Sequence, residues 1–133
     1  MISGAAATVI FDTDILIWLQ RRHQAAIRLV DETEERLVAV QSYMEFLQGA
    51  QSPKDLLLVK DFLKNEQFNI LPLSENIGHR ASIYIEEYAV QSGLRAGDAL
   101  IAATAVEHNL VLATGNRKHF QVIKDLKIHA FRP

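Results

Sequence analysis

The chain has 133 residues, of which 49% are hydrophobic, and a formal net charge of −2 at pH 7. This apolar content is enough for the core of one domain spanning residues 1–133. The absence of cysteine excludes disulfides, thiolate metal ligands and cysteine nucleophiles, and the near-neutral charge argues against a broadly basic nucleic-acid-binding surface. The chain lacks a basic leader and reaches Asp12 too soon to span a bilayer first, so we expect a soluble cytoplasmic protein.

Short apolar runs alternate with helical patterns along the chain. Strands are predicted at residues 8–11, 37–40, 69–72, 110–113 and 127–131. These runs lack polar alternation, which is typical of strands buried on both faces. We therefore predict an α/β fold in which a mostly parallel five-stranded sheet is covered by helices on both faces.

Capping residues mark several of the predicted helices. Ser52-Pro53 supplies an N-cap and a first helical residue for a helix over residues 54–64. Ser74 precedes a longer helix that Gly93 ends, and Asn109 is expected to close the helix that follows it.

Acidic residues stand where predicted strands give way to helices. Asp12 and Asp14 interrupt the first apolar run, Glu45 follows the second by about one helical turn, and Asp98 opens a later helical segment. Because ligands of parallel sheets bind beyond the carboxyl ends of the strands, these acids belong to the functional edge. Carboxylate oxygens suit hard cations, and the pattern therefore predicts a Mg²⁺ or Mn²⁺ site.

Each acid also has a purely structural explanation. Asp12 or Asp14 can cap the helix that follows. Asp98 can cap its helix or stabilise the first turn, and Glu45 can be a solvated helix charge. Helix chemistry alone gives no reason to bring Asp12, Glu45 and Asp98 to one strand-end crevice, which favours a common site.

Basic residues are expected around the acidic edge. They are Arg21, Arg22, Arg95, Arg117, Lys118 and His119. Each follows an acidic or strand-end position closely enough to flank the acids and bind phosphates, as does His23. Ordinary solvated charge is the alternative explanation of each cluster.

Four segments of the chain form a joint pattern: residues 11–17, 42–49, 97–105 and 110–120. The first opens as hydrophobic-Asp-Thr-Asp, the middle two hold Glu45 and Asp98, and the last holds a strand and the turn at Asn116. In this order and spacing they resemble the PIN-domain ribonucleases, particularly the VapC-like toxins of bacterial and archaeal toxin–antitoxin pairs. The resemblance covers nearly the whole chain, and Asp14 stands where Asn is commoner.

The resemblance implies a three-layer α/β/α fold and a Mg²⁺- or Mn²⁺-dependent endoribonuclease. Catalytic residues and metal ligands would be Asp12, Glu45 and Asp98. Asn116 would occupy a fourth catalytic position, where some PIN domains have Asp, without adding negative charge. Supporting residues would be Asp14, Thr13 and Thr114. Attack by a metal-activated water would leave a 5′-phosphate.

The same resemblance implies partners. The substrate would be RNA, bound in part by the basic residues around the acids. A small antitoxin would place its C-terminal segment in the acidic groove. Separately, the apolar stretch over residues 56–63 exceeds one narrow stripe, and this indicates either a homodimer contact or a deeply buried helix.

Other classes share parts of the pattern. Asp12 and Asp14 also resemble the Asp-x-Asp opening of haloacid-dehalogenase-like phosphatases, with Asp12 as phosphoryl acceptor, but the later motif of that family needs an acid where this chain has Ala102. A phosphorylation receiver needs an acceptor Asp after the third strand, and residues 70–74 contain none. A PIN-like domain that binds RNA without cleaving it is a further alternative.

Aromatic residues on the predicted helices have a simpler interpretation. Trp18 and the pair Tyr84 and Tyr88 are expected to be packing or subunit-contact residues rather than platforms for RNA bases.

Overall fold

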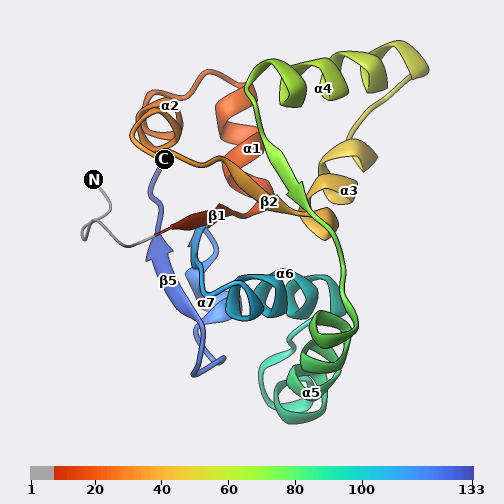
Figure 1. The fold of residues 1–133 in the computed structure, drawn as a ribbon, viewed down its shortest axis with the longest axis vertical. Helices are drawn as coiled ribbons and strands as arrows, with labels where there is room; N and C mark the ends of the chain where they lie inside the picture. Colours follow the sequence, from red (N-terminus) through yellow and green to blue (C-terminus); the bar gives the residue numbers. More distant parts are fainter. Residues whose placement is uncertain (1–7) are drawn as a thin grey trace.

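A parallel sheet lies at the centre of the structure (Figure 1). The computed structural model describes residues 8–133, so the expectation that residues 1–7 hold no leader lies outside the described residues. The strands are β1 (Val9–Phe11), β2 (Leu37–Ala39), β3 (Asn69–Leu71), β4 (Val111–Thr114) and β5 (Lys127–Ala130). Their order is β3-β2-β1-β4-β5, and each neighbouring pair is parallel. The predicted fold class is confirmed.

Helices cover both faces of this sheet. Within residues 8–133 they are α1 (Thr13–Gln20), α2 (Gln24–Asp31), α3 (Val40–Gln48), α4 (Pro53–Asn65), α5 (Glu75–Ser92), α6 (Ala96–Glu107) and α7 (Arg117–Phe120). Figure 1 shows α1 to α4 on one side of the sheet and α5 to α7 on the other. The three-layer arrangement follows from the alternation of strands and helices. No helix of the described part is long and apolar enough to cross a membrane.

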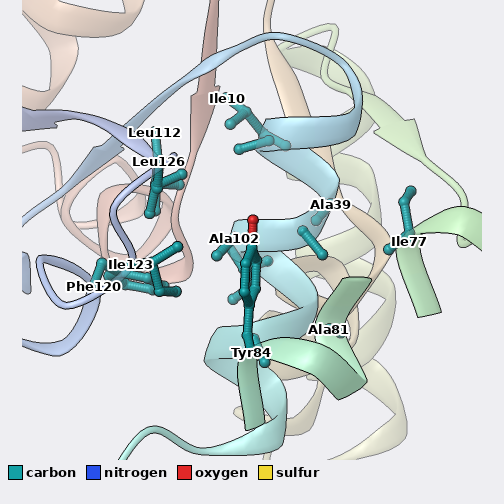
Figure 2. Packing of buried hydrophobic residues seen from close by; sticks show 14 of the residues in the cluster. Ile10, Ala39, Ile77, Ala81, Tyr84, Ala102, Leu112, Phe120, Ile123 and Leu126 are labelled. Atoms are coloured by element: carbon teal, nitrogen blue, oxygen red, sulfur yellow. The ribbon is translucent and has the colours of Figure 1, made fainter. Parts of the chain in front are cut away.

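The central strands divide their side chains between two cores. Ile10 and Leu112 pack with Phe120 in the core beneath α5, α6 and α7, which Figure 2 shows from close by. Phe11 and Ala113, the next residues on the same strands, belong to the core under α1 to α4. Successive side chains of a strand point to opposite faces, so both sets are buried. This explains why these runs show no polar alternation.

The edge strands differ from the sequence prediction. Burial on both faces was expected for all five runs, but β3 is largely exposed, with Ile70 38% exposed, and β5 is exposed at both ends. An edge strand projects beyond the helices that cover the middle of the sheet. Strand ends also shift by a residue: Val40 already belongs to α3, Pro72 and Phe131 lie outside the strands, and Thr114 lies inside β4.

The predicted caps are confirmed. Ser52 and Ser74 accept hydrogen bonds from backbone amides in the first turns of α4 and α5, at 3.0 and 3.2 Å. Gly93 ends α5 with φ 73°, and Asn109 follows α6 with φ 55°. Both are left-handed positions, which Gly and Asn adopt most readily. The short turn after Gly93 folds α6 back along α5.

Aromatic side chains mostly pack, as predicted. Tyr84 lies in the core shown in Figure 2, and its hydroxyl lies 3.1 Å from each carboxylate oxygen of Asp125. Tyr88 packs against the same core, and Trp18 packs against the other.

Helix α4 has two unlike faces. Val59 and Leu63 are buried, whereas Leu57 and Leu58 are 62% and 58% exposed. The alternative of a deeply buried helix is therefore wrong for the outer face of α4.

Candidate active site

Parallel strands bring the acidic residues to one edge of the sheet. Asp12 directly follows β1, and its amide donates to the Ala113 carbonyl of β4 at 3.0 Å. Glu45 lies on α3, which begins where β2 ends, and Asp98 lies in the first turn of α6. Helices α3 and α6 cover opposite faces of the sheet but contact each other at this edge. The acids thus approach from both faces.

Asp12 is the most buried of these acids, with 5% of its surface exposed. Its Oδ1 accepts the Thr13 amide at 2.8 Å and caps α1, while its Oδ2 accepts the Thr114 hydroxyl at 2.7 Å. Burial, and then the charge of Asp14, raises the pKa of Asp12 to about 7, although both hydrogen bonds favour the ionised form. The side chain is fixed in place but poorly compensated for its charge.

Asp14 has a different role from a helix cap. Its Oδ2 accepts the Gly115 amide at 2.8 Å and lies 3.5 Å from Nδ2 of Asn116, so it ties α1 to the turn after β4. Its Oδ1 is buried and has no hydrogen-bond partner within residues 8–133. Burial raises the pKa of Asp14 as well. A Cβ at Gly115 would lie 2.6 Å from Oδ2 of Asp14, so a larger residue here would force the Asp14 carboxylate to move.

Glu45 is held through both carboxylate oxygens. Its Oε1 accepts the Thr13 hydroxyl at 2.7 Å, and its Oε2 accepts Nε2 of Gln41 at 2.9 Å. Gln41 lies one helical turn earlier on α3, on the same face. Gly97 of α6 packs against this pair: a Cβ there would lie 2.9 Å from Oε2 of Glu45 and 3.0 Å from Nε2 of Gln41.

Asp98 is a first-turn residue, since the N-cap of α6 is Arg95, whose side chain makes no capping bond. Its Oδ2 lies 3.9 Å from Nδ1 of His119. Burial raises the pKa of Asp98, and the Glu45 charge acts in the same direction, while His119 and Arg95 oppose them. Asp98 therefore feels Glu45 on one side and two basic residues on the other.

The acids influence one another without meeting at a common point. Asp98 contributes to the raised pKa of Asp12, after burial and Asp14. Within residues 8–133, however, no three Asp, Glu or His side chains gather closely enough to form a ready-made metal cage. Glu45 in particular is drawn toward Gln41 and Thr13.

Thr114 connects the buried acid to the neighbouring turn. Its hydroxyl donates to Asp12 and accepts the Asn116 amide at 2.9 Å. Thr114 is fully buried, and its hydroxyl proton is donated to the Asp12 carboxylate. Thr114 therefore orients Asp12 and does not act as a nucleophile.

The basic residues predicted near the site separate into groups. Arg117, Lys118 and His119 line a cavity of about 500 Å³ together with Gly115 and Asn116. Arg95 lies at the start of α6, close enough to Asp98 to influence that carboxyl group.

Residues after α1 lie differently. Arg21 lines a separate cavity of about 250 Å³ that also contains Glu45, and its guanidinium carbon lies 5.8 Å from the Trp18 ring centre. Arg22 occupies a left-handed turn with φ 63° and lines neither cavity. His23 caps α2, accepting the Ala25 amide at 3.3 Å, which gives it a structural role.

The sequence pattern of the PIN domain matches residues 9–126 of this chain. The chain belongs to the PIN-domain family. The toxins of this family are nucleases, which gives the protein its coarse functional class.

Solved structures share this fold. A chain of a toxin–antitoxin complex from Klebsiella pneumoniae is 30% identical, covering 90% of this chain and 95% of that one, with a TM-score of 0.74. FitAcB from Neisseria gonorrhoeae is 25% identical over 95% and 98% of the two chains, with a TM-score of 0.72. VapBC2 from Rickettsia felis, bound to a DNA fragment from its promoter, is 19% identical over 94% and 99%, with a TM-score of 0.78. No curated protein matches the sequence.

Membership of the PIN-domain family removes the rival enzyme class. The phosphatase motif would need an acid at Ala102, which is fully buried in α6 and shown within the core in Figure 2. A receiver would need an acid after β3, where the chain continues as Pro72 and Leu73.

Three positions that sequence reasoning missed shape the PIN-domain site: Gln41, Gly97 and Gly115. The spacing of Gln41 and Glu45 on one helix face was a usable signal. The two glycines gave none, because their importance depends on how closely α6 and the β4–α7 turn approach side chains far away in sequence.

The fit at Gly97 generates a first prediction. Gly97→Ala should displace Glu45 and Gln41, since the new Cβ would lie within 3.0 Å of both side chains. We expect about a tenfold to hundredfold loss of nuclease rate, as for small misplacements of catalytic groups, with thermal stability retained. Gly78→Ala, on α5 where nothing lies within 4 Å, is the matched control. Equal nuclease rates for the Gly97 variant and wild type would contradict the role of this contact.

The buried Asp12 generates a second prediction. Because its folded pKa is raised from 3.8 to about 7, its contribution to stability is fully present below pH 3.8 and is lost as pH rises through 7. A difference of one pKa unit between the folded and unfolded states corresponds to about 1.4 kcal/mol of unfolding free energy. Because Asn carries no charge at any pH, Asp12→Asn should be a few kcal/mol more stable than wild type at pH 8 in chelator. Urea unfolding across this pH range measures the difference. The exposed Asp61→Asn controls for net charge, and an Asp12→Asn protein that tracks wild type at every pH would refute the argument.

Proposed function

We propose that this PIN-domain protein is a divalent-metal-dependent endoribonuclease and the toxin of a toxin–antitoxin pair. The observation that best supports an enzyme is the environment of Asp12. Its carboxylate is nearly buried, accepts a hydrogen bond through each oxygen and lies near other acids. Such an arrangement destabilises the protein without a cation. It is therefore expected where a cation or substrate is bound, and less so in a domain that only binds RNA.

The donor groups fit a hard cation. Donors at this edge are oxygens, and Oδ1 of Asp14 is buried without a hydrogen bond. Burial and, after it, the charge of Asp14 raise the pKa of Asp12, and a positive ion would offset both effects. The acids do not form a closed cage, but Mg²⁺ keeps several waters and commonly takes only one or two carboxylates directly. The residues therefore suit a hydrated Mg²⁺ or Mn²⁺ ion.

In the proposed mechanism, Asp12, Glu45 and Asp98 would hold this ion directly or through water. When bound, the ion makes water a stronger nucleophile and offsets charge on the phosphate. Gln41 and Thr13 fix the Glu45 carboxylate, so that it approaches from α3 in one orientation.

The neutral groups complete the site. Thr114 keeps Asp12 oriented by donating to its Oδ2. Asn116 presents a neutral amide beside Asp14 that can orient a water or a phosphate oxygen. Water and not the ribose 2′-hydroxyl is the proposed nucleophile; its oxygen bonds to phosphorus as the P–O3′ bond breaks, which leaves a 5′-phosphate and a 3′-hydroxyl.

A small antitoxin is the proposed protein partner. The Klebsiella relative is part of a toxin–antitoxin complex, and the Rickettsia structure holds its pair on promoter DNA. We expect the partner to place Arg or Lys side chains against the acids, since charge-assisted bonds replace the positive charge of the ion. The site of action would be the cytoplasm, where RNA is available.

A homodimer of single-domain chains, residues 1–133, remains a prediction. The apolar surface that supports it is the outer face of α4, where Leu57 and Leu58 are exposed. Sedimentation equilibrium would test it directly, because a monomeric mass at all concentrations would exclude the dimer.

The mechanism predicts unequal losses at the site. Asp12→Asn, Glu45→Gln and Asp98→Asn should each lower the cleavage rate of cellular RNA by at least about a thousandfold, since the cation supplies several kcal/mol of transition-state stabilisation. Asn116→Ala should lose less, because it removes a neutral contact. Sequencing of 5′-phosphate ends and rate measurements with and without chelator are the readouts.

The control for this series is Asp61→Asn, which removes an equal charge from exposed α4. Circular dichroism should show a retained fold for every variant. Undiminished, chelator-resistant cleavage by Asp12→Asn/Asp98→Asn would disprove the metal mechanism, and binding of RNA with no cleavage by wild type would favour the non-catalytic alternative.

Competition between partner and RNA is the fourth prediction. A decapeptide of alternating Arg and Ser should bind wild type and bind Asp12→Asn/Asp98→Asn at least about tenfold more weakly, because a hydrogen bond to a charged group contributes about 1.5–3 kcal/mol. The same peptide with citrulline in place of Arg keeps the size and loses the charge. Calorimetry without RNA measures binding, and anisotropy of labelled RNA, corrected for peptide–RNA binding, measures displacement. Simultaneous binding without displacement would contradict the shared edge.

A further inference from the structure

A cavity beside the acidic edge is not used by the chemistry described above. It has a volume of about 500 Å³ and lies between the β4–α7 turn and the end of β5. This size suits a group as large as a nucleotide. Gly115 and Asn116 line it, and both also contact Asp14, so the cavity and the acids share a wall.

The shape of the cavity is fixed by the sheet. β4 and β5 pair from Val111 through Thr114, and the Phe131 amide donates to the Thr114 carbonyl at 2.8 Å. On the other side, the buried Phe120 anchors α7 in the core, where Figure 2 shows it. Phe120 and Phe131 therefore anchor the segments that carry Arg117, Lys118 and Arg132.

Positive charge from two elements meets in this cavity. Arg117 and Lys118 come from α7, and Arg132 follows β5. All three are exposed, and none forms an ion pair within residues 8–133. For a chain with a net charge of −2, this is a local concentration of uncompensated positive charge next to the acids.

Other arginines of the chain show what a structural role looks like. Arg36 pairs with Asp31 and Glu66, and Arg80 pairs with Glu107 and Asp125. Each of these guanidinium groups is shared between two carboxylates from different elements. The cations of the cavity have no such partners in the described chain, so their charge is available to a ligand.

We infer that this cavity is a subsite for the RNA chain, in which Lys118 and Arg132 bind a phosphate next to the one that is cleaved. The inference rests on the proposed ribonuclease function. A strand with its reacting phosphate at the acids continues past Asn116 into the cavity, where Lys and Arg supply point and bidentate donors for phosphate.

This subsite binds backbone and does not discriminate bases. Phe131 of the lining is 7% exposed and packs in the core, so its ring offers no face for stacking, and the exposed ring of the lining, His119, lies 3.9 Å from Asp98. Contacts to phosphate add affinity and position without reading sequence. The contribution of the cavity should therefore be the same for RNAs of different sequence.

The test compares the removal of two positive charges from the cavity with the removal of two positive charges outside it. Lys118→Gln/Arg132→Gln removes two charges from the cavity, and Lys124→Gln/Lys127→Gln removes two exposed charges near the amino end of β5, away from the acids. Binding of two ten-nucleotide single-stranded RNAs of unrelated sequence is measured by anisotropy in chelator at several salt concentrations. We expect the cavity variant to bind both RNAs about tenfold more weakly and to lose about 1.4 from the slope of log K against log salt, as for two phosphate contacts to a single strand. The control should match wild type.

Several outcomes separate the explanations. Lys118→Arg/Arg132→Lys should restore the slope, which excludes misfolding as the cause of the loss. Wild-type cleavage with an unchanged slope in the cavity variant would overturn the subsite alone, whereas wild type that neither binds nor cleaves RNA would overturn the proposed function with it. A decaglutamate peptide whose binding depends on Lys118 and Arg132, with RNA binding unaffected, would show that the cavity takes an acidic protein segment and would also overturn the inference.

Discussion

The structure depends on keeping a negative charge where the protein environment opposes it. Asp12 must stay at the end of β1, because its Oδ1 caps α1 and its backbone continues the pairing of β1 with β4. In that position it is nearly buried and faces Asp14. Two hydrogen bonds favour ionisation, yet burial outweighs them and the pKa rises. The local fold thus places the carboxylate accurately and leaves its charge to be balanced by something that binds.

The positions of the acidic side chains depend on two glycines as well as on hydrogen bonds. Gly97 lets α6 approach the Glu45–Gln41 pair, and Gly115 lets the β4–α7 turn approach Asp14. In each case a Cβ would lie within 3.0 Å of a polar side-chain atom. Such contacts draw elements from both faces of the sheet to one edge. The acids can then lie close enough for their charges to influence one another.

The sequence contained enough information for the fold and for the identity of the acids, but not for their contacts. Runs such as the one before Asp12 marked buried strands, and Ser74 and Gly93 marked the limits of α5. The same reasoning failed for β3, because an apolar run does not tell a central strand from an edge strand. It also favoured Asp14 over Asp12 as the capping residue, whereas the structure chooses Asp12. The choice depends on Gly115, about a hundred residues away in sequence, and local patterns carry no information about such pairings.

The pairing of charged residues says more about what this molecule can bind than its net charge does. The net charge of −2 suggests little affinity for a polyanion, but it averages over two kinds of basic residue. Arg36 and Arg80 are neutralised by acids and join elements together. Lys118 and Arg132 have no acidic partner in the described chain and stand beside carboxylates that themselves lack compensation. The wall formed by Gly115 and Asn116 separates these unpaired negative and positive charges. The acids therefore attract a cation, and the basic residues across the wall attract the phosphates of an RNA chain.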